Sequence, residues 1–246
     1  MILPYLDLSR TLFIDIETVS EKANYNDLDD NFRKLWAKKS GLITREQDLS
    51  EEDIAKSYND KAGIFSEFAK TVVISVGFLR KEGQQNILRL KSFKGDDEKE
   101  VLTGLINLLN KGFNDPLNSF LCGHNIKEFD IPFLCRRMMI HGLEIPDIIQ
   151  VAGKKPWETK QFIDTMELWK FGDNKNYTSL NLLAAVLGIP SPKDDIDGSE
   201  VGNVYWKEGD LDRISAYCQK DVKTVVQVLL RMQGKPILED EQIEFT

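Results

Sequence analysis

Two acidic residues, Asp15 and Glu17, interrupt the apolar run FIDIETVS at 13–20. The β-branched and apolar residues around them, with no Gly or Pro, predict a strand. Because side chains alternate along a strand, Asp15 and Glu17 should share one face, with Ile14 and Ile16 on the other. Two like charges beside an apolar core are costly unless a cation lies between them or the strand end meets solvent. This stretch alone leaves both interpretations open.

Two further polar groups follow. In GHNIKEFD, 123–130, Asn125 and Asp130 come after a short apolar segment that we expect to be a strand. Ligands gather at the carboxyl ends of strands in α/β sheets. In YCQKD, 217–221, Tyr217 and Asp221 lie four residues apart on an expected helix and therefore share a face. Taken alone, Asn125 is better explained as a helix cap. The three groups are informative together, because each lies in the expected structural setting and they follow one another in this order.

Together the three groups resemble the motifs of the DEDD superfamily of 3′–5′ exonucleases, the DnaQ-like, ribonuclease H-like group. FIDIET resembles its first motif, HNIKEFD its second and YCQKD its third. The tyrosine form of the third motif is similar to the branch that contains the proofreading domains of B-family DNA polymerases. The histidine branch would carry its base at position 216, which is Ala216 here. The resemblance spans residues 11 to about 230.

The resemblance implies a site built on five residues, of which four carboxylates would hold the metal: Asp15, Glu17, Asp130 and Asp221. Glu17 or the fifth catalytic residue, Tyr217, would orient the attacking water. Four residues are implied substrate contacts: Thr18, Val19, Asn125 and Phe129. With two histidines in the chain, the donors suit hard cations, Mg²⁺ or Mn²⁺. Two such ions about 3.5–4 Å apart can activate a water and stabilise the leaving oxygen.

The expected reaction is hydrolysis of a nucleic acid from a free 3′ end, preferably single-stranded, to nucleoside monophosphates. The resemblance favours DNA over RNA, although both present the same phosphate. Two alternatives remain. A haloacid-dehalogenase-type phosphatase also opens on a strand with two acids, but its later GDxxxD element would need an acid where GDNKNY ends in Tyr177. A binding module with this fold and an inactive site is the other.

Composition limits the function further. Of the 246 residues, 41% are hydrophobic and 29% charged, which is typical of a soluble globular protein. The net charge of −8 argues against coating nucleic acid through a basic surface. Three cysteines without a CxxC pair argue against zinc and favour a reducing, cytoplasmic setting. The chain start shows no secretory signal, and the longest apolar run, 72–79, is too short for a bilayer, so we expect no membrane partner.

The order of expected elements gives an α/β layer fold, and the resemblance implies a mixed five-stranded sheet flanked by helices. We expect one exonuclease domain, 1–246, with a helical insertion at about 21–62 anchored by Leu35, Trp36, Ile54 and Tyr58. Arg137 is expected on a solvated helix face and His124 in a structural role. The other expected strands are 71–79, 86–93, 119–123 and 160–164, and the helices are 96–112, 129–142, 165–171, 178–188 and 210–232.

Overall fold

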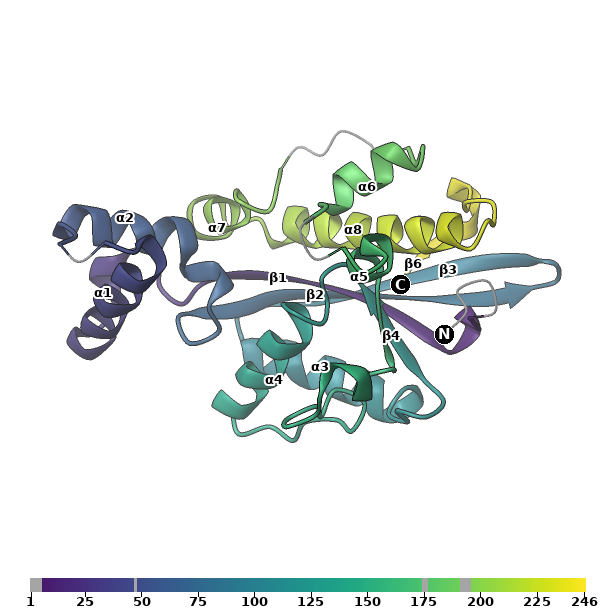
Figure 1. Cartoon of the computed structure of the whole chain (residues 1–246), viewed down its shortest axis with the longest axis horizontal. Coiled ribbons are helices and arrows are strands. Elements are labelled where there is room, and N and C mark those ends of the chain that lie inside the picture. The colour runs from purple at the N-terminus through teal and green to yellow at the C-terminus, as the bar shows by residue number, and fades with distance from the viewer. Residues whose placement is uncertain (1–5, 47, 174–176, 191–195) are drawn as a thin grey trace.

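A mixed six-stranded sheet in the order β5-β4-β1-β2-β3-β6 forms the centre of the computed structural model, which describes residues 6–46, 48–173, 177–190 and 196–246 (Figure 1). The strands are β1 (Thr11–Ser20), β2 (Ala69–Glu82), β3 (Gln85–Lys94), β4 (Phe120–Gly123), β5 (Phe162–Asp164) and β6 (Ile243–Phe245). Strands β1, β2 and β3 are antiparallel, whereas β4 and β5 continue the sheet parallel to β1. The expected mixed sheet is confirmed, with one strand more, because β6 adds in parallel to β3.

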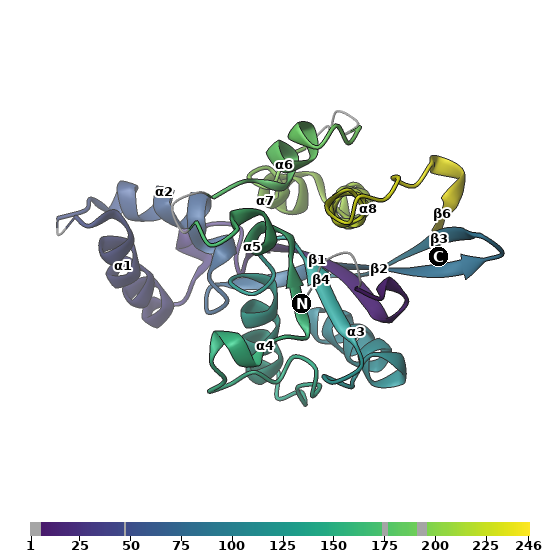
Figure 2. The same ribbon diagram turned by 45° about the vertical axis from the view of Figure 1, so that its right-hand side comes forward.

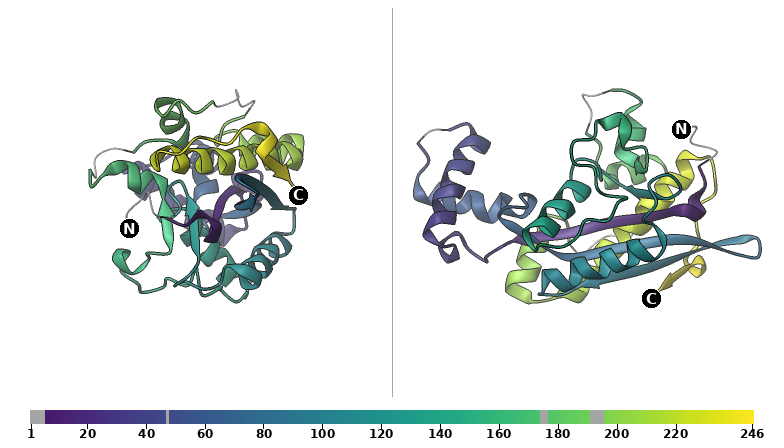
Figure 3. Two further views of the ribbon diagram at one scale, coloured as in Figure 1. Left: turned by 90° about the vertical axis from the view of Figure 1, so that its right-hand side faces the viewer. Right: turned by 90° about the horizontal axis from the view of Figure 1, so that it is seen from below.

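Helices cover both faces of this sheet. Figures 1 and 2 show α8 on one face and α3 with α4 on the other, and the left view of Figure 3 shows the layers along the long axis. The helices are α1 (Asp30–Thr44), α2 (Glu51–Lys61), α3 (Glu98–Gly112), α4 (Asp130–Ile140), α5 (Thr165–Lys170), α6 (Leu180–Val186), α7 (Val201–Asn203) and α8 (Leu211–Met232). A π-helical segment, Val204–Glu208, continues α7.

The two faces of β1 enter different cores. Ile14 and Ile16 pack with the side chains of α3 and α4, while Phe13 packs with those of α8. Helix α8 can lie close to the sheet because Gly77 of β2 has no side chain. A Cβ at that position would lie 3.0 Å from Val222 Cγ1 of α8. The alternation that the sequence predicts for β1 is therefore the one observed.

Side-chain caps explain where several helices begin. Asp97 accepts hydrogen bonds from two amides at the start of α3, and Asp210 does the same for one amide of α8. Ser50 caps α2 as expected, with its hydroxyl 2.6 Å from Asp53 Oδ2. Helix α3 ends at Gly112, as expected.

The insertion folds as two helices with a small core of their own. Trp36 of α1 is fully buried against Tyr58 and Phe68, at ring-centroid distances of 5.3 and 5.0 Å. Its Nε1 donates to Ser57 Oγ at 3.1 Å, which satisfies the buried indole. Trp36 and Tyr58 are anchors as expected, but Leu35 is not. Its side chain is 47% exposed, because neighbouring side chains on a helix point about 100° apart and Trp36 takes the buried side.

Arg137 is also placed differently from the prediction. Its side chain is buried, and its guanidinium donates to both Glu98 carboxylate oxygens and to the Ser66 carbonyl oxygen at 2.9 Å. His141 Nε2 lies 2.6 Å from the same Glu98 carboxylate. Burial would raise the pKa of Glu98, but the hydrogen bonds from Arg137, Thr71 and His141 lower it overall. This network ties α4 to α3 and to the start of β2.

Within the described ranges, no helix combines the length and the apolarity needed to cross a membrane.

Candidate active site

The first carboxylate pair lies where β1 passes under α8. Oxygen atoms of Asp15 and Glu17 and the sulfur of Cys218 all lie within 4.8 Å of one another. Cys218 belongs to α8, so both acidic side chains point to the α8 face, as the strand period predicts. Cys218 Sγ is 3.3 Å from Asp15 Oδ2 and donates its weak hydrogen bond there. Glu17 is buried and Asp15 partly buried.

Asp130 joins this pair from the first residue of α4. Its carboxylate is buried near the backbone of Ile16, which lies between the two acids of β1. Burial, opposed in part by the backbone amides of Asp130 itself and of Ile16, raises the pKa of Asp130 to about 7. The charge of Asp130 in turn raises the pKa of Asp15 and of Glu17, so the second acidic motif lies beside the first.

Tyr217 and Asp221 complete the cluster from α8. The Tyr217 hydroxyl donates a hydrogen bond to the Asp221 carboxylate, one helical turn further on. Burial and the charges of Asp221, Glu17 and Asp15 raise the pKa of Tyr217 far above its ordinary value. The phenol therefore keeps its proton at neutral pH and can donate or orient, but it cannot serve as a base.

The four carboxylates repel one another. Burial raises the pKa of Asp15 well above its usual range, and the charges of Asp221, Glu17 and Asp130 raise it further. Glu17 behaves alike, through burial and the charges of Asp221 and Asp130. Divalent cations fit this donor set, because hard oxygen ligands converge in a buried site whose charge is otherwise unfavourable.

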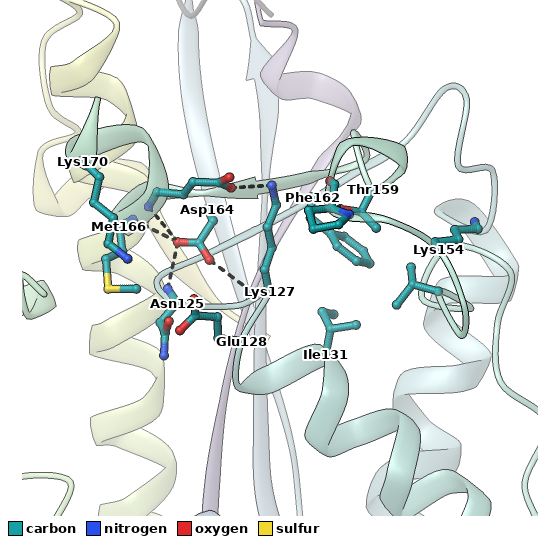
Figure 4. Close-up of a pocket in the computed structure, with 13 residues that line it drawn as sticks. Asn125, Lys127, Glu128, Ile131, Lys154, Thr159, Phe162, Asp164, Met166 and Lys170 are labelled. Carbon is teal, nitrogen blue, oxygen red and sulfur yellow. Dashed lines mark hydrogen bonds and ion pairs between the residues drawn. The ribbon is translucent and has the colours of Figure 1, made fainter. Parts of the chain in front are cut away.

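The loop that carries the second motif is held by Asp164, the last residue of β5. Its carboxylate accepts hydrogen bonds from the amide of Asn125 at 3.0 Å and of Lys127 at 3.2 Å, while also capping α5 (Figure 4). Lys127 forms an ion pair with Glu167 of α5. Asn125 has a φ of 64°, so this anchoring holds it in the left-handed conformation. Its side-chain Oδ1 is buried without a hydrogen-bond partner among the described residues.

A cavity of about 370 Å³ opens beside this loop. Asn125, Lys127 and Asp164 line it on one side, and Lys154 and Lys170 lie on other parts of its wall (Figure 4). The cavity therefore shares Asn125 with the expected substrate contacts and adds three lysines around it.

The glycine and histidine before Asn125 position this loop. A Cβ on Gly123 would lie 2.9 Å from the Ile14 carbonyl oxygen, so only glycine lets β4 approach β1 here. His124 Nε2 lies 2.8 Å from the Thr178 carbonyl oxygen and Nδ1 lies 2.9 Å from Thr165 Oγ1. Burial lowers the pKa of His124. The neutral ring donates from Nε2 and accepts at Nδ1, which is the structural role expected of it.

The other expected substrate contacts are placed in different ways. The Thr18 hydroxyl donates to the Gly63 carbonyl oxygen at 2.7 Å, directly after Glu17. The Val19 side chain is buried among Val72, Val73 and Ile196 and is not brought to the site. Phe129 is partly exposed at the start of α4, with its ring centroid 5.6 Å from that of Phe133.

Two neighbours of the acids were not found from the sequence. Cys218 follows Tyr217 directly, but nothing in its spacing indicates contact with Asp15. Asp164 precedes the expected helix 165–171, which identifies it as a helix cap, and it does cap α5. Its contact with Asn125 crosses from β5 to β4 and has no local sequence signal.

Comparisons with known proteins agree with this geometry. Residues 64–241 match the model of a family described as "Predicted 3′-5′ exonuclease related to the exonuclease domain of PolB". The matched range includes Asp130, Tyr217 and Asp221 and begins after Asp15 and Glu17. A search of curated proteins finds no match.

A solved structure, the family B DNA polymerase of the hyperthermophilic archaeon Pyrobaculum calidifontis, has the same fold over 90% of this chain, with a TM-score of 0.56 and 14% identity. The match covers 24% of the polymerase, so this chain corresponds to about a quarter of its length. The family match extends over well over half of the residues, with the second and third acidic motifs inside it. The chain therefore belongs to the family of predicted 3′–5′ exonucleases related to the exonuclease domain of PolB.

Proposed function

We propose that this protein is a metal-dependent 3′–5′ exonuclease that releases nucleoside monophosphates from a DNA strand. The observation that carries the proposal is the convergence of four carboxylates from β1, α4 and α8. Burial and mutual repulsion raise the pKa of Asp15 and of Glu17, so a cation between the carboxylates would be favourable. The family relation supports phosphodiester hydrolysis as the reaction, and the relation to a polymerase domain supports DNA.

We propose that Asp15, Glu17, Asp130 and Asp221 hold two divalent cations, Mg²⁺ or Mn²⁺. When bound, these ions would supply a nucleophile at neutral pH and neutralise charge on the reacting phosphate. The protein's own contribution is to fix the ligands, through the Cys218 thiol on Asp15 and the placement of Asp130 at the start of α4. Convergence on rigid strands and helices reduces the reorganisation needed during reaction.

Tyr217 would orient the attacking water through its hydroxyl, while its proton stays in place because its pKa is raised. Asn125 would contact the terminal nucleotide through its unpartnered Oδ1, which is an acceptor held toward the site by the Asp164 bonds. Phe129 would offer its ring beside that nucleotide. Thr18 and Val19 would contribute through backbone atoms, because the Thr18 hydroxyl is engaged and the Val19 side chain is buried.

The test uses 5′-labelled single- and double-stranded DNA and RNA with Mg²⁺, with Mn²⁺ and with excess EDTA. We expect a stepwise ladder that shortens from the 3′ end, is strongest on single-stranded DNA and disappears with EDTA. Asp221→Asn should abolish it. A matched control is Asp212→Asn on the same helix, an exposed acid paired with Lys94. Nucleotide release in EDTA, or removal of the terminal phosphate alone, would overturn the proposal.

A further inference from the structure

Helix α1 of the insertion is basic in an acidic protein. Residues 31–45 hold five basic side chains and no acidic one, more than any other acid-free run of the chain, whose net charge is −8. They are Arg33, Lys34, Lys38, Lys39 and Arg45. Lys34 and Lys38 lie four apart, so their like charges destabilise the isolated helix. Local helix stability does not explain this pattern.

Most of this charge is not neutralised within the protein. Arg33 forms an ion pair with Asp30. In the described part of the chain, no ion pair involves Lys34, Lys38 or Lys39, and Lys39 Nζ lies 4.4 Å from the centroid of the Phe65 ring. Lys34 and Lys38 are exposed. These ammonium groups are available to an anionic partner.

Beside these lysines, α1 borders a groove of about 770 Å³ whose other wall is the end of α4. Lys22, Lys38 and Lys39 line it together with exposed apolar side chains, and the acids Glu21, Asp29 and Glu67 also belong to its wall. Leu35 is 47% exposed and Ile140 of α4 is 56% exposed. Positive groups next to apolar surface suit single-stranded nucleic acid, because the positive groups can bind its phosphates and the apolar surface can bind its bases. A duplex would bury its bases away from this surface.

The groove lies close to the acid cluster. It is also lined by Glu21, four residues after Glu17, which is about 13 Å along an extended chain. From the other side, α4 leads from Asp130 at its start to Ile140 in the groove, a helix about 16 Å long. The right view of Figure 3 shows α1 and α2 at the end of the sheet where β1 enters the insertion. A strand with its 3′ end at the acids can reach α1 within a few nucleotides.

We propose that the groove between α1 and α4 holds the single strand upstream of the 3′ end. Lys38 and Lys39 in its wall would pair with phosphates, and Lys34, one helical turn before Lys38 on α1, would pair with a phosphate just outside it. This inference rests on the proposed exonuclease function. Four carboxylates at the point of reaction would repel a nucleic acid. The basic side chains of the insertion would offset this repulsion by attracting the phosphates of the strand. Nucleic acid is the proposed occupant because its phosphates are negative and the acid-free run 31–45 is basic.

The experiment compares two triple variants of equal charge. Lys34→Gln/Lys38→Gln/Lys39→Gln changes α1, and Lys81→Gln/Lys111→Gln/Lys235→Gln changes exposed lysines elsewhere. Two of the control positions are far from α1. Lys81 lies on the β2–β3 hairpin and Lys235 follows the end of α8, and both elements lie at the opposite end of the molecule from α1 (Figure 1). Both variants are made with Asp221→Asn, so that labelled 20-mer and 3-mer DNA bind without turnover.

For the 20-mer, the slope of log K against log[salt] should become shallower by about 2 in the α1 variant, because three phosphate contacts are lost at about 0.7 each. The control variant should keep the parent slope. The affinity defect should be larger for the 20-mer than for the 3-mer. Because Lys39 lies over Phe65, the double variant Lys34→Gln/Lys38→Gln is the safeguard for folding, checked by circular dichroism.

Equal slopes for the α1 and control variants would overturn the inference. The exposed leucines of the groove would then indicate a site for a protein partner. Failure of the inference and failure of the proposed function are distinguishable. If the wild-type protein hydrolyses DNA and the α1 variants bind DNA normally, only the inference about the groove is wrong. A wild-type protein that hydrolyses no nucleic acid defeats both.

Discussion

The carboxylate of Asp164 lies 3.0 Å from the backbone nitrogen of Asn125 and, through the same oxygen, caps α5 at the Met166 amide, also at 3.0 Å. One side chain at the end of β5 therefore fixes both the loop that leads to Asp130 and the start of a helix. The Asn125 conformation, with its positive φ, depends on this bond.

Asp164→Ala should cost about 2–4 kcal/mol of folding free energy, because a helix cap and two buried amide partners are lost together. Turnover should also fall by at least tenfold as Asn125 moves. Urea unfolding and single-turnover hydrolysis measure the two effects. Asp97→Ala is the matched control, since Asp97 caps α3 without touching the loop. It should cost about 1 kcal/mol and leave turnover near wild type. Equal losses of turnover in both variants would show that Asp164 acts only as a cap.

The metal-free protein should become less stable as the pH rises from about 4 to about 7. Over this window the folded state keeps the proton on Asp130, whose pKa is about 7, while the unfolded chain, with an ordinary value of 3.8, has lost it. Stability therefore falls with pH, and Asp15 and Glu17 act in the same direction. Melting temperatures in EDTA from pH 5 to 8, with Asp130→Asn as reference, test this.

Asp130→Asn should lose part of that pH dependence, because an amide does not titrate. Addition of Mn²⁺ at pH 8 should raise the melting temperature of the wild type more than that of the variant. A melting temperature that rises with pH between 5 and 7 in the wild type but not in Asp130→Asn would have the wrong sign for this explanation.

Tyr217→Phe should reduce turnover roughly ten- to a thousandfold, less than the upper end of the about 10²–10⁴-fold range of full acid–base catalysis, because the hydroxyl only orients the water. The ring and its packing remain, and only the hydroxyl bonded to Asp221 is removed. Mn²⁺ affinity, measured by titration calorimetry, should hardly change. Tyr205→Phe is the control, because it removes a hydroxyl bonded to Asp96 at 2.7 Å. An unchanged rate in Tyr217→Phe would reduce Tyr217 to a packing residue.

Cys218 should bind a thiophilic cation together with Asp15 and Glu17, because its sulfur lies within 4.8 Å of their oxygens. A metal ion deprotonates a coordinating thiol even where burial raises the pKa of that thiol, as it does for Cys218. Addition of Cd²⁺ should therefore produce sulfur-to-metal charge-transfer absorption. Cys218→Ser should lose this absorption, whereas Cys135→Ser, at a cysteine outside the cluster, should retain it. Absorption that survives in Cys218→Ser would place the bound Cd²⁺ elsewhere.

Periodic and local features of this fold could be predicted from the sequence. The common face of Asp15 and Glu17 follows from the two-residue period of a strand. The helix start at Asp164 follows from capping chemistry, which acts over two or three residues. The antiparallel pair β2 and β3 was recognisable from two apolar runs around Gly83, whose φ of 60° suits the turn.

Features that depend on distant contacts could not be predicted. The burial of Arg137 depends on Glu98, 39 residues earlier, and a helix pattern carries no information about that partner. The contact of Cys218 with Asp15 joins residues 203 positions apart. Strand β6 has three residues, too few to show a period, and exists because β3 offers it an edge. The sequence predicts that Leu35 is buried, but the buried face of α1 carries Trp36 and leaves Leu35 partly exposed.

The acid cluster takes residues from β1, α4 and α8, the last of which begins at Leu211. A protein made on a ribosome emerges from its N-terminus onward, at about 5–20 residues per second. The α8 carboxylate must therefore leave the ribosome before the cluster can form, many seconds after β1. A nascent chain that still lacks α8 carries two of the three acidic motifs and no complete site. The centre therefore cannot assemble during synthesis until the residues up to Asp221 have emerged.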